Sequence, residues 1–424
     1  MPRPFSLSSR SLIVLGASSR ALAESALRAG STPIAVDLFA DVDLRARCRA
    51  FRIPRVEWPC GIPRALARLP RVPVVWTGAL ENHPEVLARI AASRPVLGTS
   101  PRKLAAVRDP RRLGSVLASA GLRAPRCALA GERVDAAGTW LVKPLRSAAG
   151  IGVRIATEDE IPADHYGQAL IPGTPTSIVG LGWRGGARLL GATRQLIGVE
   201  WLGASGFRYA GNVGPIALSP RLEERLERAA RAVARAFELR GLFGIDLVID
   251  DDGEPWGVEV NPRYTASVEV IERATGRSLL DLHLRATLGE TISLSSLDGL
   301  EATRRAVPRI VAKGILWARS SRRVPADLAE PFATSVALAD VPAPGDEIPA
   351  GHPVTTILVE AATEDEAVAI LRRAASEIDE RLLDDAVDAA PAMEGRVDPA
   401  LGPRGSSLPC ASDAPGHHGL ARFA

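Results

Sequence analysis

Short apolar runs alternate with helical periodicity along the first hundred residues. The runs SLIVLGA (11–17), TPIAVD (32–37) and RVPVVWTG (71–78) predict buried strands, residues 20–30 and 83–93 predict helices, and residues 95–100 predict a short strand and turn. Strands that alternate with helices favour a parallel sheet covered by helices. We therefore expect an open parallel sheet in an α/β domain that spans residues 1–100.

The turn after the first predicted strand, GASSRA (16–21), lacks the third glycine of a dinucleotide-binding fingerprint. We interpret it as a loop that faces a ligand or a neighbouring domain, and not as an NAD site. Asp37 ends the second strand, where an acidic residue would hold the ribose of NAD. Without the glycines, a structural or helix-capping aspartate is the favoured interpretation.

Residues 138–156 (GTWLVKPLRSAAGIGVRIA) read as a strand, a loop of small residues and a second strand, after a helical connection over 101–120. Such a hairpin is not a P-loop, because a P-loop opens a helix. Gly150 and Gly152 still allow the loop N–H groups to approach an anion. Lys143 precedes the loop on an apolar strand, where an unpaired ammonium would be costly. This pattern indicates that Lys143 binds a phosphate group. The alternative is that Lys143 is a surface lysine in a salt bridge.

An apolar segment interrupted by Pro172 and Gly173 follows in YGQALIPGTPTSIVGLGW (166–183). Such a hinge can present backbone carbonyl and N–H groups to the edge of a purine, although a plain β-turn would carry the same residues. The segment ARLLGATRQLIG (187–198) predicts a further pair of strands. Residues 221–241 have apolar positions at helical spacing and end at a glycine, so they predict a long amphipathic helix.

The segment LFGIDLVIDDDGEPWGVEVNPRY (242–264) predicts two strands joined by the turn DDGEP. Glu259 and Asn261 are two residues apart and point to one face, and pairing across the turn brings Asp246 opposite that region. Two carboxylates and an amide oxygen are hard ligands that suit Mg²⁺ shared with nucleotide phosphates. Arg263 would supply positive charge for an anionic transition state. The alternative is a set of ordinary strand-end polar residues in which Glu259 pairs with Arg263.

Composition narrows the classes of function. The chain has 52 Lys and Arg residues against 49 Asp and Glu residues, and this net charge of +3 indicates neither a nucleic-acid nor a membrane partner. The 4 cysteines (Cys48, Cys60, Cys127 and Cys410) form no C-x-x-C pair, which favours a reduced, cytoplasmic protein over a disulfide scaffold. The apolar run at 11–17 is too short to span a bilayer. Residues 389–424 are rich in Pro, Gly, Ala and Ser and predict a disordered tail.

The ordered set of motifs resembles the ATP-grasp superfamily, which includes D-alanine–D-alanine ligase, biotin carboxylase and several purine-biosynthesis ligases. The resemblance is carried by Lys143-Pro144 with its small-residue loop, the hinge at 168–173, and Asp246 followed by Glu259-x-Asn261-Pro262-Arg263. It implies a pre-ATP-grasp domain at 1–100, an ATP-grasp domain at 101–290 and a β-rich C-terminal domain at 300–388. Within the ATP-grasp domain it implies a lid lobe at 121–184 and a metal-binding lobe at 185–290.

The resemblance also implies roles for single residues. Lys143, Ser147, Gly150 and Gly152 would contact ATP phosphates; the backbone of Gln168, Ala169, Leu170 and Ile171 would hold adenine; Asp246, Glu259 and Asn261 would bind Mg²⁺; and Arg263 and Lys143 would be catalytic. Arg194 and Asn212 lie between the lid and the final lobe, and we expect them to hold the acceptor substrate.

Three positions depart from the family pattern. Pro110 follows Asp109 where many members carry a lysine, which leaves Arg108, Arg111 or Arg112 to make that phosphate contact. Ala169 stands where the hinge usually has a glutamate that helps to hold the adenine amino group. Gly244 stands where ligases of the D-alanine type have an arginine, which argues against a dipeptide ligase of that subtype.

The resemblance implies an enzyme that is dependent on ATP and Mg²⁺ and joins a small-molecule carboxylate to an amine through an acyl-phosphate. Uncharacterised proteins near the tyramine–glutamate ligase of methanofuran synthesis are similar, which implies a role in cofactor biosynthesis. A homodimer is the candidate oligomeric state. Three alternatives stay open: a carboxylase that uses bicarbonate, a kinase-like enzyme, and a non-catalytic nucleotide-binding regulatory module.

Overall fold

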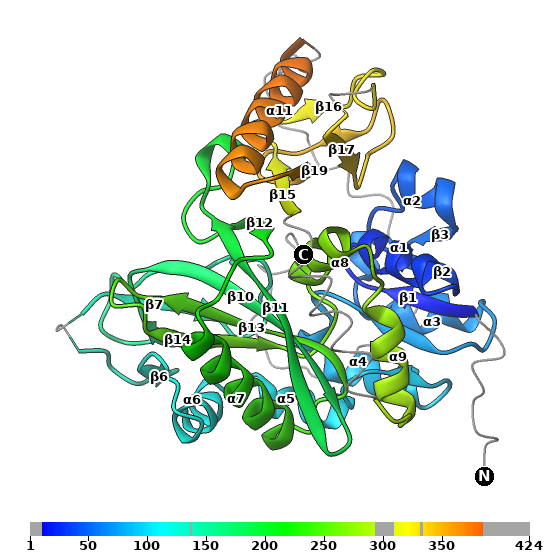
Figure 1. Ribbon diagram of the computed structural model, residues 1–424. Coiled ribbons are helices and arrows are strands. Elements are labelled where there is room, and N and C mark those ends of the chain that lie inside the picture. Colours follow the sequence, from blue (N-terminus) through cyan, green and yellow to red (C-terminus); the bar gives the residue numbers. More distant parts are fainter. Residues whose placement is uncertain (1–10, 136–137, 293–308, 331–333, 385–424) are drawn as a thin grey trace, which may run out of the picture.

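The computed structural model describes residues 11–135, 138–292, 309–330 and 334–384. Figure 1 shows a parallel sheet with its helices, a small lid sheet, and a large antiparallel sheet that continues into the C-terminal strands and helix α11. The predicted tail at 389–424 lies outside the described residues. The mixed α/β architecture agrees with the fold class expected from the sequence.

The N-terminal region is a five-stranded parallel sheet in the order β3-β2-β1-β4-β5. Its strands are β1 (Ser11–Leu15), β2 (Thr32–Asp37), β3 (Arg49–Arg52), β4 (Val74–Trp76) and β5 (Val96–Leu97). Its helices are α1 (Arg20–Arg28), α2 (Val42–Arg47), α3 (Ile62–Ala67) and α4 (Pro84–Ala91), with short 3₁₀ turns η1 (Arg55–Glu57) and η2 (Leu80–Asn82). The central strands are buried apolar runs because helices cover the sheet.

Two consecutive helices, α5 (Pro101–Val107) and α6 (Pro110–Ser119), lead into the lid. The Asp109 side chain caps α6 by accepting hydrogen bonds from the N–H groups of Arg111 at 3.0 Å and Arg112 at 3.1 Å. Pro110 occupies the first helical position, where its missing N–H costs no hydrogen bond. The Asp109-Pro110 pair therefore fixes a sharp helix start directly after Arg108.

The lid is a four-stranded antiparallel sheet in the order β6-β9-β7-β8. Its strands are β6 (Cys127–Leu129), β7 (Trp140–Pro144), β8 (Arg154–Ile155) and β9 (His165–Ala169). Strands β7 and β8 pair in antiparallel register, which confirms the hairpin predicted at 138–156. Lys143 therefore stands at the base of the small-residue loop.

The largest sheet has eight strands in the order β14-β13-β10-β11-β12-β15-β19-β17. The strands are β10 (Thr174–Trp183), β11 (Gly186–Ile197), β12 (Tyr209–Gly214), β13 (Gly241–Ile249), β14 (Pro255–Asn261), β15 (Ile310–Trp317), β17 (Val336–Ala339) and β19 (Pro353–Ala361). The strand pair predicted at 187–198 is wrong, because β11 is continuous. Gly191 lies within this strand and leaves room for Ile271, since a Cβ there would lie 2.9 Å from the Ile271 Cδ1 atom.

Helices cover this sheet in two places. Helix α7 (Pro220–Ala236) and α6 share an apolar cluster with β10, β11 and β13, which confirms the long amphipathic helix predicted from the sequence. Helix α11 (Glu364–Asp384) packs its apolar side against β15 and β19. A 3₁₀ turn η3 (Glu200–Leu202) and a two-stranded sheet of β16 (Arg322–Arg323) and β18 (Glu347–Ile348) complete the C-terminal region.

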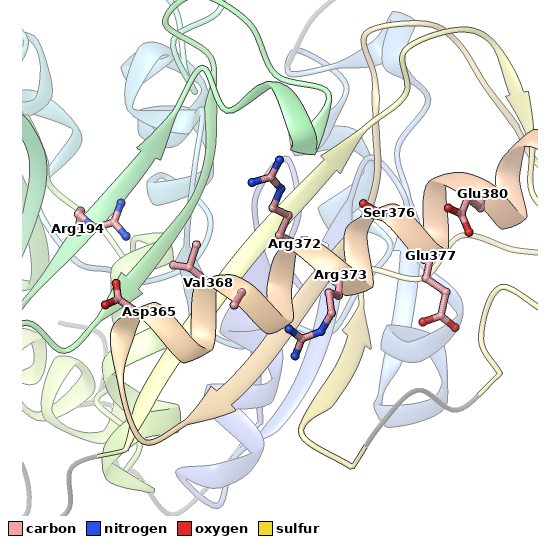
Figure 2. A pocket seen from close by; sticks show the side chains of 9 residues that line it. Arg194, Asp365, Val368, Arg372, Arg373, Ser376, Glu377 and Glu380 are labelled. Atoms are coloured by element: carbon pink, nitrogen blue, oxygen red, sulfur yellow. The ribbon is translucent and has the colours of Figure 1, made fainter.

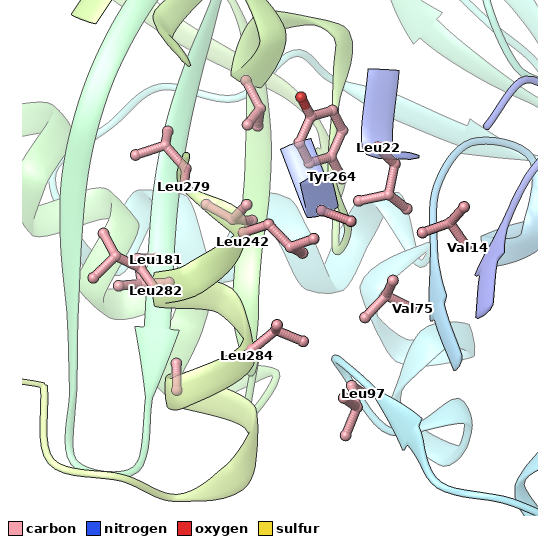
Figure 3. Close-up of a cluster of buried hydrophobic side chains, with 14 of the residues drawn as sticks. Val14, Leu22, Val75, Leu97, Leu181, Leu242, Tyr264, Leu279, Leu282 and Leu284 are labelled. Atoms are coloured by element: carbon pink, nitrogen blue, oxygen red, sulfur yellow. The ribbon is translucent and has the colours of Figure 1, made fainter. Parts of the chain in front are cut away.

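An apolar cluster joins the parallel sheet to the large sheet (Figure 3). Val14, Leu22, Val75 and Leu97 from the N-terminal region meet Leu181, Leu242 and Tyr264, together with helices α8 (Ala266–Thr275) and α9 (Leu280–Leu288). Because this contact is buried and apolar, it fixes one face of the parallel sheet against strands β10, β11 and β13 of the large sheet. In the described part of the chain, no helix is both long and apolar enough to cross a bilayer.

Candidate active site

A cavity of about 1210 Å³ lies where the parallel sheet, the lid, the β13–β14 hairpin and the C-terminal region meet. Most of the residues singled out in the sequence line it: Lys143, Ser147, Gly150, Gln168, Ala169, Leu170, Ile171, Asn212, Asp246, Glu259, Asn261 and Arg263. Two predicted residues, Gly152 and Arg194, do not belong to its lining. The fold thus brings segments more than a hundred residues apart into one site.

The β13–β14 hairpin positions the candidate metal ligands. Its register places Asp246 directly opposite Glu259, as the turn chemistry predicted. The Asn261 Nδ2 atom donates to the Asp246 carboxylate at 2.9 Å, and Gln195 on β11 donates to its other oxygen at 3.1 Å. The three oxygen-bearing side chains therefore converge on one face of the hairpin.

Charge in this group favours a bound cation. Burial, and then the nearby Glu259 carboxylate, raise the pKa of Asp246 to about 6. A cation between the two carboxylates would relieve both the burial cost and the repulsion. Among the described residues, no three His, Cys, Asp or Glu side chains form a metal site by themselves. The donor set of Asp246, Glu259 and Asn261 therefore fits Mg²⁺ that takes its remaining ligands from phosphates and water.

Lys143 faces the cavity from strand β7. Its Nζ atom donates to the Gln168 side-chain oxygen at 3.1 Å and lies 5.5 Å from the centre of the Tyr166 ring. Burial would lower the pKa of Lys143, but Tyr166 and Glu259 more than offset it and raise the pKa above its usual value. Within the described residues Lys143 makes no ion pair with a carboxylate, unlike the salt-bridged surface lysine considered as the alternative. It therefore presents a charged ammonium to the cavity.

Arg263 is fixed by an acidic residue that the sequence analysis missed. Its Nε and Nη2 atoms donate to one oxygen of Glu81, at 2.8 and 2.6 Å, and Nη2 also donates to Asn261 at 3.1 Å. Glu81 lies on η2, in the connection that follows strand β4, and its side chain is 1% exposed. The Glu259–Arg263 pair considered as the alternative to a metal site does not form, because Glu259 pairs with Arg108. The signal for Glu81 was its place in the loop that follows a buried parallel strand, although the sequence did not indicate its partner.

The loop of small residues docks onto the segment before β12. The Tyr209 N–H donates to the Ala149 carbonyl at 3.0 Å, and Asn82 donates to the Ser147 carbonyl at 3.0 Å. Gly150 has a φ of 71°, and a Cβ there would lie 1.9 Å from the Phe207 carbonyl oxygen. Gly152 packs instead beside the ring of Pro144, outside the cavity lining. Of the two loop glycines, only Gly150 therefore stands at the site.

The hinge after β9 has fewer free donors than expected. The N–H of Ala169 donates to the Arg126 carbonyl at 2.9 Å, and that of Leu170 donates to the Thr139 carbonyl at 2.8 Å. These two groups are therefore engaged in holding the lid together. Ile171, which lines the cavity beyond them, retains its N–H for the edge of a base as far as the described residues show.

The two residues expected at the acceptor have different positions. Arg194 points away from the cavity, pairs with Glu364, and lines a separate groove of about 630 Å³ beside helix α11 (Figure 2). The reason is strand alternation, because its neighbour Gln195 faces the cavity. The expectation that Arg194 holds the acceptor is not met in this structure.

Asn212 lies on the cavity side but is fully buried. Its amide donates to Thr193 at 2.6 Å and to Ser267 at 3.0 Å, and its oxygen accepts from the Tyr209 hydroxyl. All of these interactions are internal to the protein. Asn212 therefore orients the wall, including Tyr209, rather than offering a free group to a ligand.

The turn at 16–21 lines the cavity, as expected of a loop that faces a neighbouring domain. Asp37 holds it by accepting from the Ser19 N–H and hydroxyl, both at 2.9 Å, and from the Ala40 N–H at 2.7 Å. The structural interpretation of Asp37 is therefore correct. Arg20 at the end of this turn forms a bidentate ion pair with Glu269 of α8.

Comparison with known proteins agrees with this geometry. The ATP-grasp domain family matches residues 107–267. The chain is 28% identical over 222 residues to the carbamoyl phosphate synthase large chain of Micrococcus luteus, a match that covers 48% of this chain and 20% of that one. It is 37% identical over 105 residues to the formate-dependent phosphoribosylglycinamide formyltransferase of Methylococcus capsulatus, covering 24% of this chain and 25% of that one. The matches thus span about a quarter or less of these curated relatives.

Solved structures show the same fold over most of the chain. The biotin carboxylase domain of the 2-oxoglutarate carboxylase of Hydrogenobacter thermophilus has a TM-score of 0.66 at 15% identity, and the match covers 85% of this chain and 89% of that one. The carboxyaminoimidazole ribonucleotide synthase of Aspergillus clavatus has a TM-score of 0.65 at 16% identity, covering 88% and 99%. Residues 107–267 therefore match the ATP-grasp domain family, and most of the chain shares the fold of these solved structures.

Proposed function

We propose that this chain is an ATP- and Mg²⁺-dependent ligase that joins a small-molecule carboxylate to an amine through an acyl-phosphate. One observation carries the proposal: Lys143, the oxygen ligands of the β13–β14 hairpin and Arg263 line a single cavity within an ATP-grasp fold. The two solved neighbours are named as complexes with ADP and Mg²⁺ or with ATP, which supports the same ligands here.

Two walls of the cavity have different roles in the proposed reaction. On the lid side, the Lys143 ammonium and the N–H groups near Gly150 offer positive charge to phosphate oxygens. Asp246, Glu259 and Asn261 would hold Mg²⁺, which supplies further neutralisation of phosphate charge when it is bound. On the opposite wall of the cavity, Arg263 follows the end of the same hairpin, and Glu81 holds its guanidinium in place. The Arg263 guanidinium is placed to stabilise the negative charge of the acyl-phosphate, and the charge that develops when the amine attacks it.

The proposed reaction has two steps, phosphorylation of the acid and attack by the amine. A substrate carboxylate oxygen attacks the γ-phosphorus of ATP, the bond to the bridging oxygen breaks, and ADP leaves. The amine nitrogen then attacks the acyl carbon, phosphate leaves with the carbon–oxygen bond electrons, and the amine loses a proton. A docked lid loop keeps water away from the acyl-phosphate. The part of the cavity lined by Phe39, Asp41, Arg52 and residues 346–356 is left for the acid and the amine.

A second candidate is a carboxylase in which bicarbonate is the acid. The names of the neighbours favour it, since a 2-oxoglutarate carboxylase domain and a carboxyaminoimidazole ribonucleotide synthase share the fold over most of the chain. Both candidates use the same nucleotide site, so the site residues do not separate them. The narrower likeness to tyramine–glutamate ligase and the cytoplasmic location stay predictions. A homodimer also remains a proposal, supported by the dimer named for the 2-oxoglutarate carboxylase domain.

The test is the release of ADP from ATP and Mg²⁺ across a panel of carboxylic acids, each with and without amines. We expect release that needs both an acid and an amine and that Glu259→Gln abolishes. Glu224→Gln, an exposed glutamate paired with Arg228 on α7, is the matched control and should leave the rate unchanged. Release with bicarbonate alone would identify the carboxylase. Release that persists in Glu259→Gln would refute both.

A further inference from the structure

Arg108 holds the central candidate metal ligand. It is the C-cap residue of α5, and its Nη1 atom forms an ion pair with the Glu259 carboxylate on β14. Its Nη2 atom donates to the Leu145 carbonyl at 3.3 Å, at the start of the lid loop. The two paired side chains are only 16% and 30% exposed. A guanidinium therefore lies between the metal-binding hairpin and the loop that faces the phosphates.

The neighbouring arginines do not share this position. Arg111 points outward and pairs with Glu132, and Arg112 lies over the ring of Phe237, 5.4 Å from its centre. Neither belongs to the cavity lining, whereas Arg108 does. The helix start fixed by Asp109 and Pro110 therefore leaves Arg108 as the arginine of this segment that reaches the site.

The pair sets up a competition for Glu259. The Arg108 guanidinium is in direct contact with the Glu259 carboxylate, and both side chains are mostly shielded from water. A protein cation thus occupies the carboxylate oxygen that a metal ion would coordinate. A metal ion can coordinate this oxygen only after Arg108 has left it. Phosphate oxygens near the lid loop are the natural alternative partner for the guanidinium.

We propose that Arg108 is an exchangeable counter-ion: it pairs with Glu259 until nucleotide phosphates enter, then moves onto the phosphates and frees Glu259 for the metal. The metal ion consequently binds together with the nucleotide and not ahead of it. This inference rests on the proposed ATP and Mg²⁺ site. The inference specifies the order in which metal and nucleotide bind, which the metal-binding side chains alone do not determine.

The test measures Mn²⁺ binding by electron paramagnetic resonance, with and without adenylyl imidodiphosphate. Wild type should bind Mn²⁺ at least about tenfold more tightly with the nucleotide than without it. Without nucleotide, Arg108→Ala should bind Mn²⁺ about tenfold more tightly than wild type, and it should bind the nucleotide about tenfold more weakly, as expected for one charge-assisted contact. Arg102→Ala removes an exposed arginine from the same helix and should match wild type.

The outcomes separate this inference from the proposed function. If wild type binds Mn²⁺ equally well with and without the nucleotide, or if Arg108→Ala binds Mn²⁺ no better than Arg102→Ala, the exchange is overturned while the nucleotide site stands. If wild type binds no nucleotide, the proposed function fails and takes the exchange with it. The wild-type comparison does not depend on whether Arg108→Ala folds.

Discussion

Asp41 is a partly buried carboxylate in the cavity wall that lowers the stability of the folded protein when it is ionised. It precedes helix α2, and its carboxylate has no hydrogen bond or ion pair among the described residues. Burial, followed by the charges of Asp340, Asp37 and Asp43, raises its pKa to about 8. Since the unfolded chain has the ordinary value, the folded state binds more protons between pH 4 and 8, and stability falls as the pH rises through that window.

Replacing Asp41 should therefore stabilise the protein at high pH only. Asp41→Asn should raise the thermal midpoint by about 2 °C at pH 8 and leave it nearly unchanged near pH 3, below the unfolded pKa, where the carboxyl is mostly protonated in both states. Thermal unfolding followed by circular dichroism checks this. Asp251→Asn, at an exposed hairpin position, is the control. An equal gain at both pH values would show that removal of the charge is not the cause.

Among the elements, the lid loop depends for its docking on Gly150, where a side chain would be strained and would collide with the neighbouring backbone. Gly150 combines a positive φ with close approach to the Phe207 carbonyl, and this contact docks the loop next to β12. Gly131, also in the lid, has a φ of 79°, but a Cβ added there would meet no heavy atom within 4 Å among the described residues. The two glycines therefore share a conformational requirement and differ only in the docking contact.

Alanine at Gly150 should separate these effects. Both Gly150→Ala and Gly131→Ala should lose about 1 kcal/mol of stability from the left-handed backbone. Only Gly150→Ala should also weaken ATP binding, by about tenfold, because the loop can no longer dock over the phosphates. Isothermal titration with ATP and Mg²⁺ measures this. Equal ATP affinity in the two variants would contradict a role of the docked loop in nucleotide binding.

In the whole molecule, a buried ion network joins the three main regions. Glu269 on α8 accepts from Arg20 of the N-terminal region and from Lys313 on β15 at 2.7 Å. Arg20 also pairs with Asp340 of the C-terminal region at 3.0 Å. Burial would raise the pKa of Glu269, but Arg20 and Lys313 hold it well below its usual value. The carboxylate thus balances two buried cations at the meeting point of the regions.

Neutralising this carboxylate should destabilise the fold strongly. Glu269→Gln leaves Arg20 and Lys313 buried with less compensation, which costs about 3–5 kcal/mol. The midpoint of urea-induced unfolding should fall accordingly. Glu224→Gln, which breaks an exposed i,i+4 pair, should change stability by no more than about 0.5 kcal/mol. Similar midpoints for the two variants would mean that the network does not hold the regions together.

The sequence predicted what local chemistry determines. The DDGEP turn fixed the β13–β14 register, so the approach of Asp246 to Glu259 and Asn261 could be foreseen. Contacts between distant segments could not be foreseen, because nothing near Arg108 or Glu81 in the chain points to the partners they meet on β14 and after it. Arg194 was misplaced for a third reason: a strand pattern gives two faces but does not say which one meets the cavity.

The central claim is that Lys143 and the β13–β14 hairpin form a nucleotide site, and the titration of wild type with ATP at saturating Mg²⁺ tests it most directly. We predict one site per chain, weakened at least about tenfold by Lys143→Ala, since a charge-assisted phosphate contact is lost. Lys103→Ala removes a lysine that pairs with Glu238 on the surface, and it should bind as wild type does. Absence of binding in wild type, or equal affinity in both lysine variants, would contradict the claim.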